Sequence, residues 1–323
     1  LELRQTTDKA LMVVAGGNLF EWGNFIRRMD NFLMDLYLEP DNVEALLDGL
    51  MERHLQMLSK ISEYVGDIVD IIRVGDDLGA MNGPLIDPDI YRRFFKPRHK
   101  QLCDYVKQHS NMYTFLHSCG SIYQLIPDLI EAGFDILNPV QTQTRDMEPK
   151  RLKNEFGRDI TFWGGGVETA GTLNKGTPQQ IREEVLQRLE IFSRDGGFVF
   201  NTIHNILPEV PPENIIAMFN AMGLSANGFG NHVFDGGIND FARMLDKADY
   251  PFLAVNLDFS DVELAEGAPE IEIGEDGASV QENAGKVARS SYVELGGERI
   301  GLIGRAPADF FNVINDPDET IPG

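Results

Sequence analysis

The sequence predicts an α/β protein, in which a parallel sheet or barrel is followed by a second region of different composition. Up to about residue 220, short apolar runs alternate with polar or glycine-rich turns and amphipathic stretches. Strands that alternate with helices in this way are typical of parallel α/β architectures. Beyond Gly223 the alternation ends, and an acidic segment with few aromatic residues follows at 260–286. We therefore expect two domains, residues 1–222 and residues 223–323.

Five apolar runs predict strands in the first region, and a sixth is a candidate strand. The five runs cover residues 67–74, 111–116, 134–137, 159–163 and 197–200, and the candidate is LMVVAGG at 11–17. A (β/α)8 barrel needs eight strands and about 250 residues, so the count falls short of a complete barrel.

Amphipathic stretches between these runs predict helices. They cover residues 42–64, 88–108, 121–133, 178–196 and 211–223. Asp87 before Pro88 and Thr177 before Pro178 fit the first turn of a helix, because proline lacks the amide hydrogen that a helix start leaves unpaired. Gly223 fits a helix end.

The second region predicts a helix at 240–250 and a strand at 251–259. Residues 291–306 contain two apolar runs on either side of Gly296-Gly297, which predicts a β-hairpin.

Composition excludes several classes of protein. The chain has 28 basic and 51 acidic residues, a formal charge of −23, and no block of Lys or Arg. Nucleic acids and anionic membranes both require a basic surface, so we expect neither as a partner. Cys103 and Cys119 are the two cysteines, which excludes a disulfide framework and favours a reducing compartment. We therefore expect a cytoplasmic protein.

The segment LHSCGS contains the strongest candidate site. His117 and Cys119 are two residues apart at the end of an apolar run, so their side chains project to the same side. Imidazole and thiolate suit Zn²⁺, and a catalytic zinc ion needs a third protein ligand and an open position. His204 in FNTIHN, after the last predicted strand, is the candidate third ligand. The alternative is a buried cysteine beside a hydrogen-bonded histidine.

Four long motifs carry a resemblance to a known family. They are GDDLGAMNGPLIDPDIYRRFFKPRHKQL, FLHSCGSIYQLIPDLIEAGFDILNPVQ, DITFWGGGVETAGTL and GGFVFNTIHNILPEVPPENIIAMFNA. Together they resemble the uroporphyrinogen decarboxylase superfamily, in particular its corrinoid-dependent methyltransferase branch, over about residues 10–222. The resemblance implies a (β/α)8 barrel that lacks its N-terminal part.

The methyltransferase branch implies a zinc site and a corrinoid co-substrate. Its members bind zinc through a His-x-Cys pair and a distant cysteine, and the zinc activates a thiol that attacks a methyl-corrinoid. His117 and Cys119 match this pair as metal ligands and catalytic residues. The distant cysteine has no match, and His204 occupies the corresponding region. The resemblance to the methyltransferase branch implies two partners, a small-molecule substrate and a corrinoid protein.

Uroporphyrinogen decarboxylation is the alternative reaction that the resemblance implies. It needs no metal, because the family's decarboxylases hold a polyanionic porphyrinogen with basic residues. The Arg-containing opening motif of these enzymes has no counterpart here, and the basic residues near predicted strand ends are few (Arg73, Arg145). This makes decarboxylation the weaker reading.

Four further residues are candidates for substrate binding. Asp76 and Asp77 follow one predicted strand, and Asn138 and Gln141 follow another. A turn or helix-capping role is the alternative for the two aspartates.

The second region resembles the 5′-nucleotidase branch of the calcineurin-like metallophosphatases over about residues 220–316. Within GFGNHVFDGG, Asn231 matches a metal ligand of that family and His232 matches its catalytic histidine, whereas Val233 replaces the usual glutamate. One motif cannot hold the family's divalent metal pair, so we expect no phosphatase activity from this region. A metal-dependent 5′-nucleotidase or phosphoesterase is the alternative function that this resemblance implies. A chimeric or truncated chain without a complete active site is a further alternative, with the join between Phe219 and Ala226.

Overall fold

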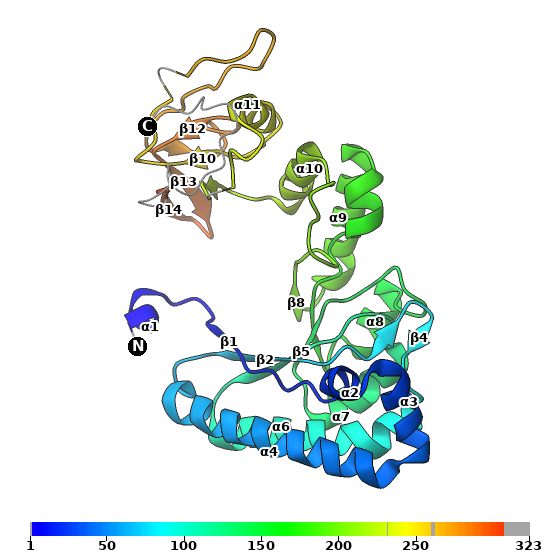
Figure 1. Ribbon diagram of the computed structural model, residues 1–323. Coiled ribbons are helices and arrows are strands. Elements are labelled where there is room, and N and C mark those ends of the chain that lie inside the picture. The colour runs from blue at the N-terminus through cyan, green and yellow to red at the C-terminus, as the bar shows by residue number, and fades with distance from the viewer. Residues whose placement is uncertain (1, 231, 260–261, 307–323) are drawn as a thin grey trace. The chain divides into compact units, whose positions relative to one another are not determined.

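The computed structural model describes residues 2–230, 232–259 and 262–306. The chain divides into two compact units (Figure 1). Unit 1 comprises the residues up to Thr169 together with Gln187–Ile206, and unit 2 comprises Ala170–Leu186 together with the residues from Leu207 onward.

Unit 1 is built on a six-stranded parallel sheet. Its strands are β1 (Met12–Val14), β2 (Ile71–Gly75), β5 (Tyr113–His117), β6 (Ile136–Asn138), β7 (Thr161–Trp163) and β8 (Phe198–Val199). They lie in the order of the chain, and every neighbouring pair is parallel. All six predicted strands are therefore confirmed, including the candidate at 11–17.

Helices connect these strands. They are α1 (Glu2–Thr6), α2 (Phe20–Arg27), α3 (Met29–Leu38), α4 (Pro40–Val65), α5 (Pro88–Ile90), a π-helical turn η1 (Tyr91–Phe95), α6 (Lys96–His109), η2 (Tyr123–Leu125), α7 (Ile126–Ala132) and α8 (Pro149–Phe156). A short hairpin of β3 (Gly79–Ala80) and β4 (Gly83–Pro84) follows β2. The turn η3 (Thr169–Leu173) and helix α9 (Pro178–Phe192) contribute residues to both units.

The two faces of the sheet have different roles, because successive side chains of a strand point to opposite faces. On one face Ile72, Leu116 and Leu137 join the main core, whose aromatic centre includes Phe20 and Phe95. Burying this apolar face is the main contribution to the stability of the unit.

The opposite face carries a small second layer of apolar residues. Ile71, Phe115 and Ile136 lie there with Trp163, whose ring is 5.4 Å from that of Phe115. Two residues further along each strand, the same face carries Arg73 in β2, His117 in β5 and Asn138 in β6. His117 and Asn138 are thus paired at the carboxyl ends of β5 and β6, above the apolar layer, whereas Arg73 lies in the middle of β2 at the level of Phe115.

Unit 2 contains two three-stranded sheets. Its named elements are α10 (Pro212–Met222), β9 (Asn227–Gly228), α11 (Ile238–Asp246), β10 (Phe252–Leu253), β11 (Ala278–Ser279), β12 (Val287–Ala288), β13 (Ser290–Leu295) and β14 (Glu298–Ile303). One sheet is β12-β10-β9, and the other is β11-β13-β14.

The predicted hairpin of unit 2 is confirmed, since Leu295 pairs with Glu298 across Gly296-Gly297. The predicted helix at 240–250 is α11, while the strand predicted at 251–259 is only two residues long. Gly223 ends α10 in the left-handed conformation at φ 73°, as the sequence predicts. Among the described residues, no helix combines the length and apolar character needed to cross a bilayer.

Candidate metal centre

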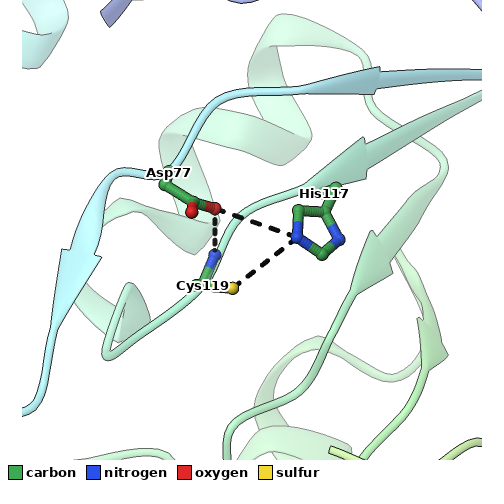
Figure 2. Close-up of side chains that lie close together, drawn as sticks. All are labelled: Asp77, His117 and Cys119. Atoms are coloured by element: carbon green, nitrogen blue, oxygen red, sulfur yellow. Dashed lines mark hydrogen bonds and ion pairs between the residues drawn. The ribbon is translucent and has the colours of Figure 1, made fainter. Parts of the chain in front are cut away.

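Three side chains at the ends of two adjacent strands form a group of potential metal ligands. Asp77 follows β2, His117 ends β5, and Cys119 lies two residues beyond it; one donor atom from each lies within 4.8 Å of the others (Figure 2). His117 Nε2 is 3.6 Å from Cys119 Sγ and 3.9 Å from Asp77 Oδ1. The two residues singled out in the sequence thus lie together, and Asp77 stands as the third member.

Asn138 fixes the tautomer of His117. Its amide nitrogen donates to the carbonyl oxygen of Trp163 at 2.8 Å, so its Oδ1 faces His117 Nδ1 at 2.6 Å. Oδ1 can only accept, and therefore Nδ1 carries the proton and Nε2 presents a lone pair toward Cys119 and Asp77. Histidine ligands of metals are oriented in this way by a hydrogen bond from their second nitrogen.

Backbone contacts between the two loops hold the donors in place. The amide of Cys119 donates to Asp77 Oδ1 at 2.8 Å, and the amide of Gly79 donates to the carbonyl of Cys119 at 3.1 Å. Gly120 has φ +87°, and a Cβ there would lie 2.2 Å from the carbonyl carbon of Gly79. Only glycine permits this approach. The amide of Gly120 also donates to the side chain of Gln141, which therefore supports the loop.

Asp76 lies next to Asp77 but points the other way. Its side chain is 0% exposed and accepts from the amides of Leu19, Phe20 and Glu21 at 3.2, 2.9 and 2.9 Å. These amides begin helix α2 and have no partner within the helix. The placement supports the capping role that the sequence left open, rather than contact with a substrate.

The donor set fits a zinc ion. Imidazole nitrogen, thiolate sulfur and carboxylate oxygen are all zinc ligands, and two ligands of a tetrahedral zinc ion lie about 3.3–3.8 Å apart. The 3.6 Å between His117 and Cys119 falls in this range, and the 3.9 Å to Asp77 is slightly longer. Three protein ligands leave a fourth position for a substrate.

The electrostatics of the group also favour a cation. Burial, followed by the negative charge of Asp77, raises the pKa of the Cys119 thiol to about 12. Burial likewise raises the pKa of Glu21, and the neighbouring Asp76 and Asp77 add to this effect. A positive ion would offset these costs and stabilise the thiolate.

His204 lies outside the group of three. Its residue is exposed, and it lines a pocket of about 490 Å³ together with Arg73, His117 and Asn138. His204 as the third ligand therefore stays a prediction, and Asp77 is the residue that the structure groups with the pair.

The candidate residues of the second region do not gather into a comparable group. His232 is exposed, and its Nδ1 lies 2.9 Å from Asp235 Oδ2, three residues along the chain. Asn231 lies outside the described residues. Within the part of the chain that the structure describes, the group at Asp77 is the one cluster of three His, Cys, Asp or Glu side chains with metal-binding spacing.

The place of Asp77 beside His117 and Cys119 was the main feature that sequence reasoning missed. Asp76 and Asp77 look equivalent in the sequence, and only the strand register shows which of them faces the His-x-Cys loop. A signal was available in the order of the chain: neighbouring strands in a parallel α/β sheet are often consecutive, so the residues after β2 could have been placed beside those after β5.

A parallel sheet with polar side chains at the carboxyl ends of its strands defines a parallel α/β protein. The chain belongs to the uroporphyrinogen decarboxylase (URO-D) family, since the family model matches residues 10–223. This match confirms the URO-D resemblance. It ends at the start of the region compared with metallophosphatases, for which the resemblance stays a prediction.

Relatives of both kinds named in the sequence analysis are found. The chain is 49% identical over 217 residues to uroporphyrinogen decarboxylase of Pseudoalteromonas translucida (strain TAC 125), covering 66% of this chain and 55% of that protein. It is 28% identical over 150 residues to methylcobamide:CoM methyltransferase MtaA of Methanosarcina barkeri, covering 46% and 40%. The chain thus spans about half the length of the curated relatives it matches.

A solved methyltransferase from Methanosarcina mazei has a similar fold. The TM-score is 0.54 at 23% identity, and the similarity covers 69% of this chain and 61% of that one.

Proposed function

We propose that this URO-D family enzyme binds zinc at Asp77, His117 and Cys119 and transfers a methyl group from a corrinoid to a thiol. The observation that carries the proposal is the donor group itself, in which Asn138 leaves the lone pair of His117 Nε2 directed toward Cys119 and Asp77. The similarity to methylcobamide:CoM methyltransferase MtaA supports the choice of reaction.

Each residue has a definite role in this proposal. His117, Cys119 and Asp77 hold the ion, and Asn138 keeps the imidazole in the required tautomer and orientation. When bound, zinc would lower the pKa of a thiol substrate, so that the thiolate is available as nucleophile near neutral pH. The pocket lined by His117 and His204 is the space in which the substrate would lie.

Cobalt substitution tests the ligand set directly. Co²⁺ bound to a thiolate gives a sulfur-to-metal charge-transfer band in the near ultraviolet, so the wild-type chain should show this band with one Co²⁺ per chain. Cys119→Ser should abolish the band. Cys103→Ser is the matched control, because Cys103 is buried in the main core, away from the site, and its change should leave the band intact.

The same titration decides between the two candidates for the third ligand. Asp77→Asn should weaken Co²⁺ and Zn²⁺ binding at least tenfold, because it removes a charged ligand, whereas His204→Ala should have a small effect. The reverse result would assign the third position to His204. Wild-type protein that binds neither ion would refute the zinc proposal.

The reaction can be followed with methylcobalamin and a small thiol such as CoM, the acceptor in the relative's name. Loss of the methylcobalamin spectrum should require both the chain and Zn²⁺, and should be absent with Cys119→Ser. A corrinoid protein as physiological methyl donor is part of the proposal, as is a cytoplasmic location.

Decarboxylation of uroporphyrinogen is the second candidate. It is favoured by the 49% identical relative, which is named uroporphyrinogen decarboxylase. Because this reaction needs no metal, porphyrinogen turnover that survives chelation and Cys119→Ser would favour it over methyl transfer.

Residues 223–323 form a separate domain in this proposal, of metallophosphatase type and without activity of its own. The exposed His232 is paired with Asp235 and lies in no described metal-binding group. We therefore expect no hydrolysis of a chromogenic phosphate ester in the presence of Mn²⁺ or Co²⁺. Hydrolysis lost on His232→Ala would contradict this expectation.

A further inference from the structure

The pocket beside the metal centre is polar. Its volume is about 490 Å³, enough for a small organic molecule. It is lined by Arg73, His117, Asn138, Pro139 and the segment 201–206. The apolar layer around Phe115 lies on the same face of the sheet, one level below His117.

Arg73 is the one cationic side chain of Lys or Arg type that lines this pocket. It comes from the middle of β2, on the same face as Ile71 and Gly75, and its residue is only partly exposed. Within the described part of the chain, its guanidinium group has no ion-pair partner. A partly buried cation without a counter-ion is costly, so a position of this kind favours an anionic ligand.

The lining contains no acidic residue, although the chain has 51 of them. The nearby acids Glu21 and Asp77 are absent from the lining, and Asp77 faces His117 Nε2 instead. His117 thus lies between Asp77, on the side suited to a cation, and a pocket lining that contains Arg73 and no carboxylate. The chain as a whole carries a net charge of −23, so this carboxylate-free lining with an arginine differs in charge from the average of the chain.

We propose that Arg73 binds an oxyanion of the substrate, a carboxylate or sulfonate, in this pocket. The guanidinium group can donate two parallel hydrogen bonds to such a group, and Asn201 and Asn205 supply neutral amide donors from the opposite segment. The assignment of the oxyanion to the substrate rests on the proposed function, whereas the anion site itself does not.

The experiment uses the full chain and four probes of similar size: propionate, propanesulfonate, propyl phosphate and neutral propionamide. Binding is measured by calorimetry at low ionic strength, where charge pairing is least screened. The three anions should bind at least tenfold more tightly than propionamide. The order among them distinguishes a carboxylate, a sulfonate and a phosphate ester as the natural group.

Two substitutions of Arg73 separate charge from geometry. Arg73→Gln should remove the preference for anions, a loss of about tenfold or more, because a charge-assisted pair in a partly buried site is lost. Arg73→Lys should retain part of the preference, since it keeps the charge without the forked geometry. Arg145→Gln is the matched control, because Arg145 is largely exposed beside Asp146 and should not change binding.

Circular dichroism and the thermal midpoint establish that each variant is folded. Should Arg73→Gln fail to fold, Arg73→Lys still decides the matter: anion affinity equal to wild type would overturn the proposal, and a severalfold loss would support it. A folded Arg73→Gln protein that keeps the anion preference overturns it as well.

Anion binding is also measured on wild-type protein treated with a chelator and on Cys119→Ser, so that the anion site can be tested without a bound metal ion. Arg73-dependent anion binding that persists in both supports the anion site, even if the chain binds no zinc and the proposed methyl transfer fails. If anion binding is lost when the metal is removed but is kept in Arg73→Gln, the anion binds the metal ion. This result would overturn the proposed role of Arg73 and would leave the metal site standing.

Discussion

Replacing Asp76 by alanine should destabilise unit 1 strongly, although Asp76 belongs to no helix or strand of its own. Its carboxylate accepts from three amides that begin helix α2, at 3.2, 2.9 and 2.9 Å, and it is 0% exposed. Alanine would leave the buried amides of Leu19 and Phe20 without an acceptor in a place that water does not reach.

The magnitude follows from these three contacts. Hydrogen bonds to a charged acceptor contribute about 1.5–3 kcal/mol each, which would give about 4.5–9 kcal/mol if all three were lost without compensation. The amide of Glu21 is only partly buried and can bond water, and the contact to Leu19 is the longest. We therefore expect Asp76→Ala to lower the free energy of unfolding by about 3–5 kcal/mol.

Urea unfolding followed by tryptophan fluorescence measures this loss. Trp22 and Trp163 are the two tryptophans, and both lie in unit 1, so the signal reports on the unit that contains Asp76. Asp104→Ala is the control: Asp104 forms an exposed pair with Lys100, and its loss should cost about 0.5 kcal/mol or less. A loss below about 1 kcal/mol for Asp76→Ala, at an unchanged slope, would refute the capping argument.

Three further predictions concern the metal centre. Asn138→Ala should weaken Zn²⁺ binding by about 10–100-fold, because it frees the imidazole of His117 to rotate and change tautomer; competition with a chromogenic chelator measures this. Gly120→Ala should displace the loop that carries Cys119, because its Cβ would lie 2.2 Å from Gly79, and should reduce both Zn²⁺ affinity and the thermal midpoint. Burial raises the pKa of Cys119 to about 12, so the rate of its alkylation by iodoacetamide in metal-free protein should keep rising with pH above pH 9. At pH 8 this rate should be lower than that of an ordinary thiol by about a hundredfold or more.

Each of these predictions has a control within the chain. Asn111→Ala, at an exposed position, should leave Zn²⁺ affinity unchanged. Gly49→Ala lies in helix α4 with nothing near its Cβ, and should stabilise by up to about 1 kcal/mol. Cys103 should not react in the folded protein, because it is fully buried. An alkylation rate for Cys119 that levels off below pH 9 would contradict the raised pKa.

The strands of unit 1 could be predicted from the sequence because each is a short apolar run bounded by turn residues. Helices α2 and α3 were not predicted. In this segment Phe25, Ile26 and Leu38 are 70, 54 and 73% exposed, so apolar residues do not mark the buried face alone.

The site could be predicted in part. The spacing of His117 and Cys119 was sufficient to place both on one side of a strand end. The third member depended on which residue of β2 lies beside them, and on the backbone turn that directs Asp76 inward and Asp77 outward. His204 was predicted because it follows the last predicted strand, whereas the structure groups Asp77, from the end of the adjacent strand, with the pair.

The ties between the loops after β2 and β5 have a consequence for how the chain can be engineered. All three donors come from two neighbouring strands, and the amides of Gly79 and Cys119 cross-link their loops directly. The geometry of the donors is therefore local and does not depend on closure of the sheet into a ring. A minimal fragment of two strands, their helices and the Asn138 support would be a reasonable starting point for transplanting the centre into another α/β scaffold.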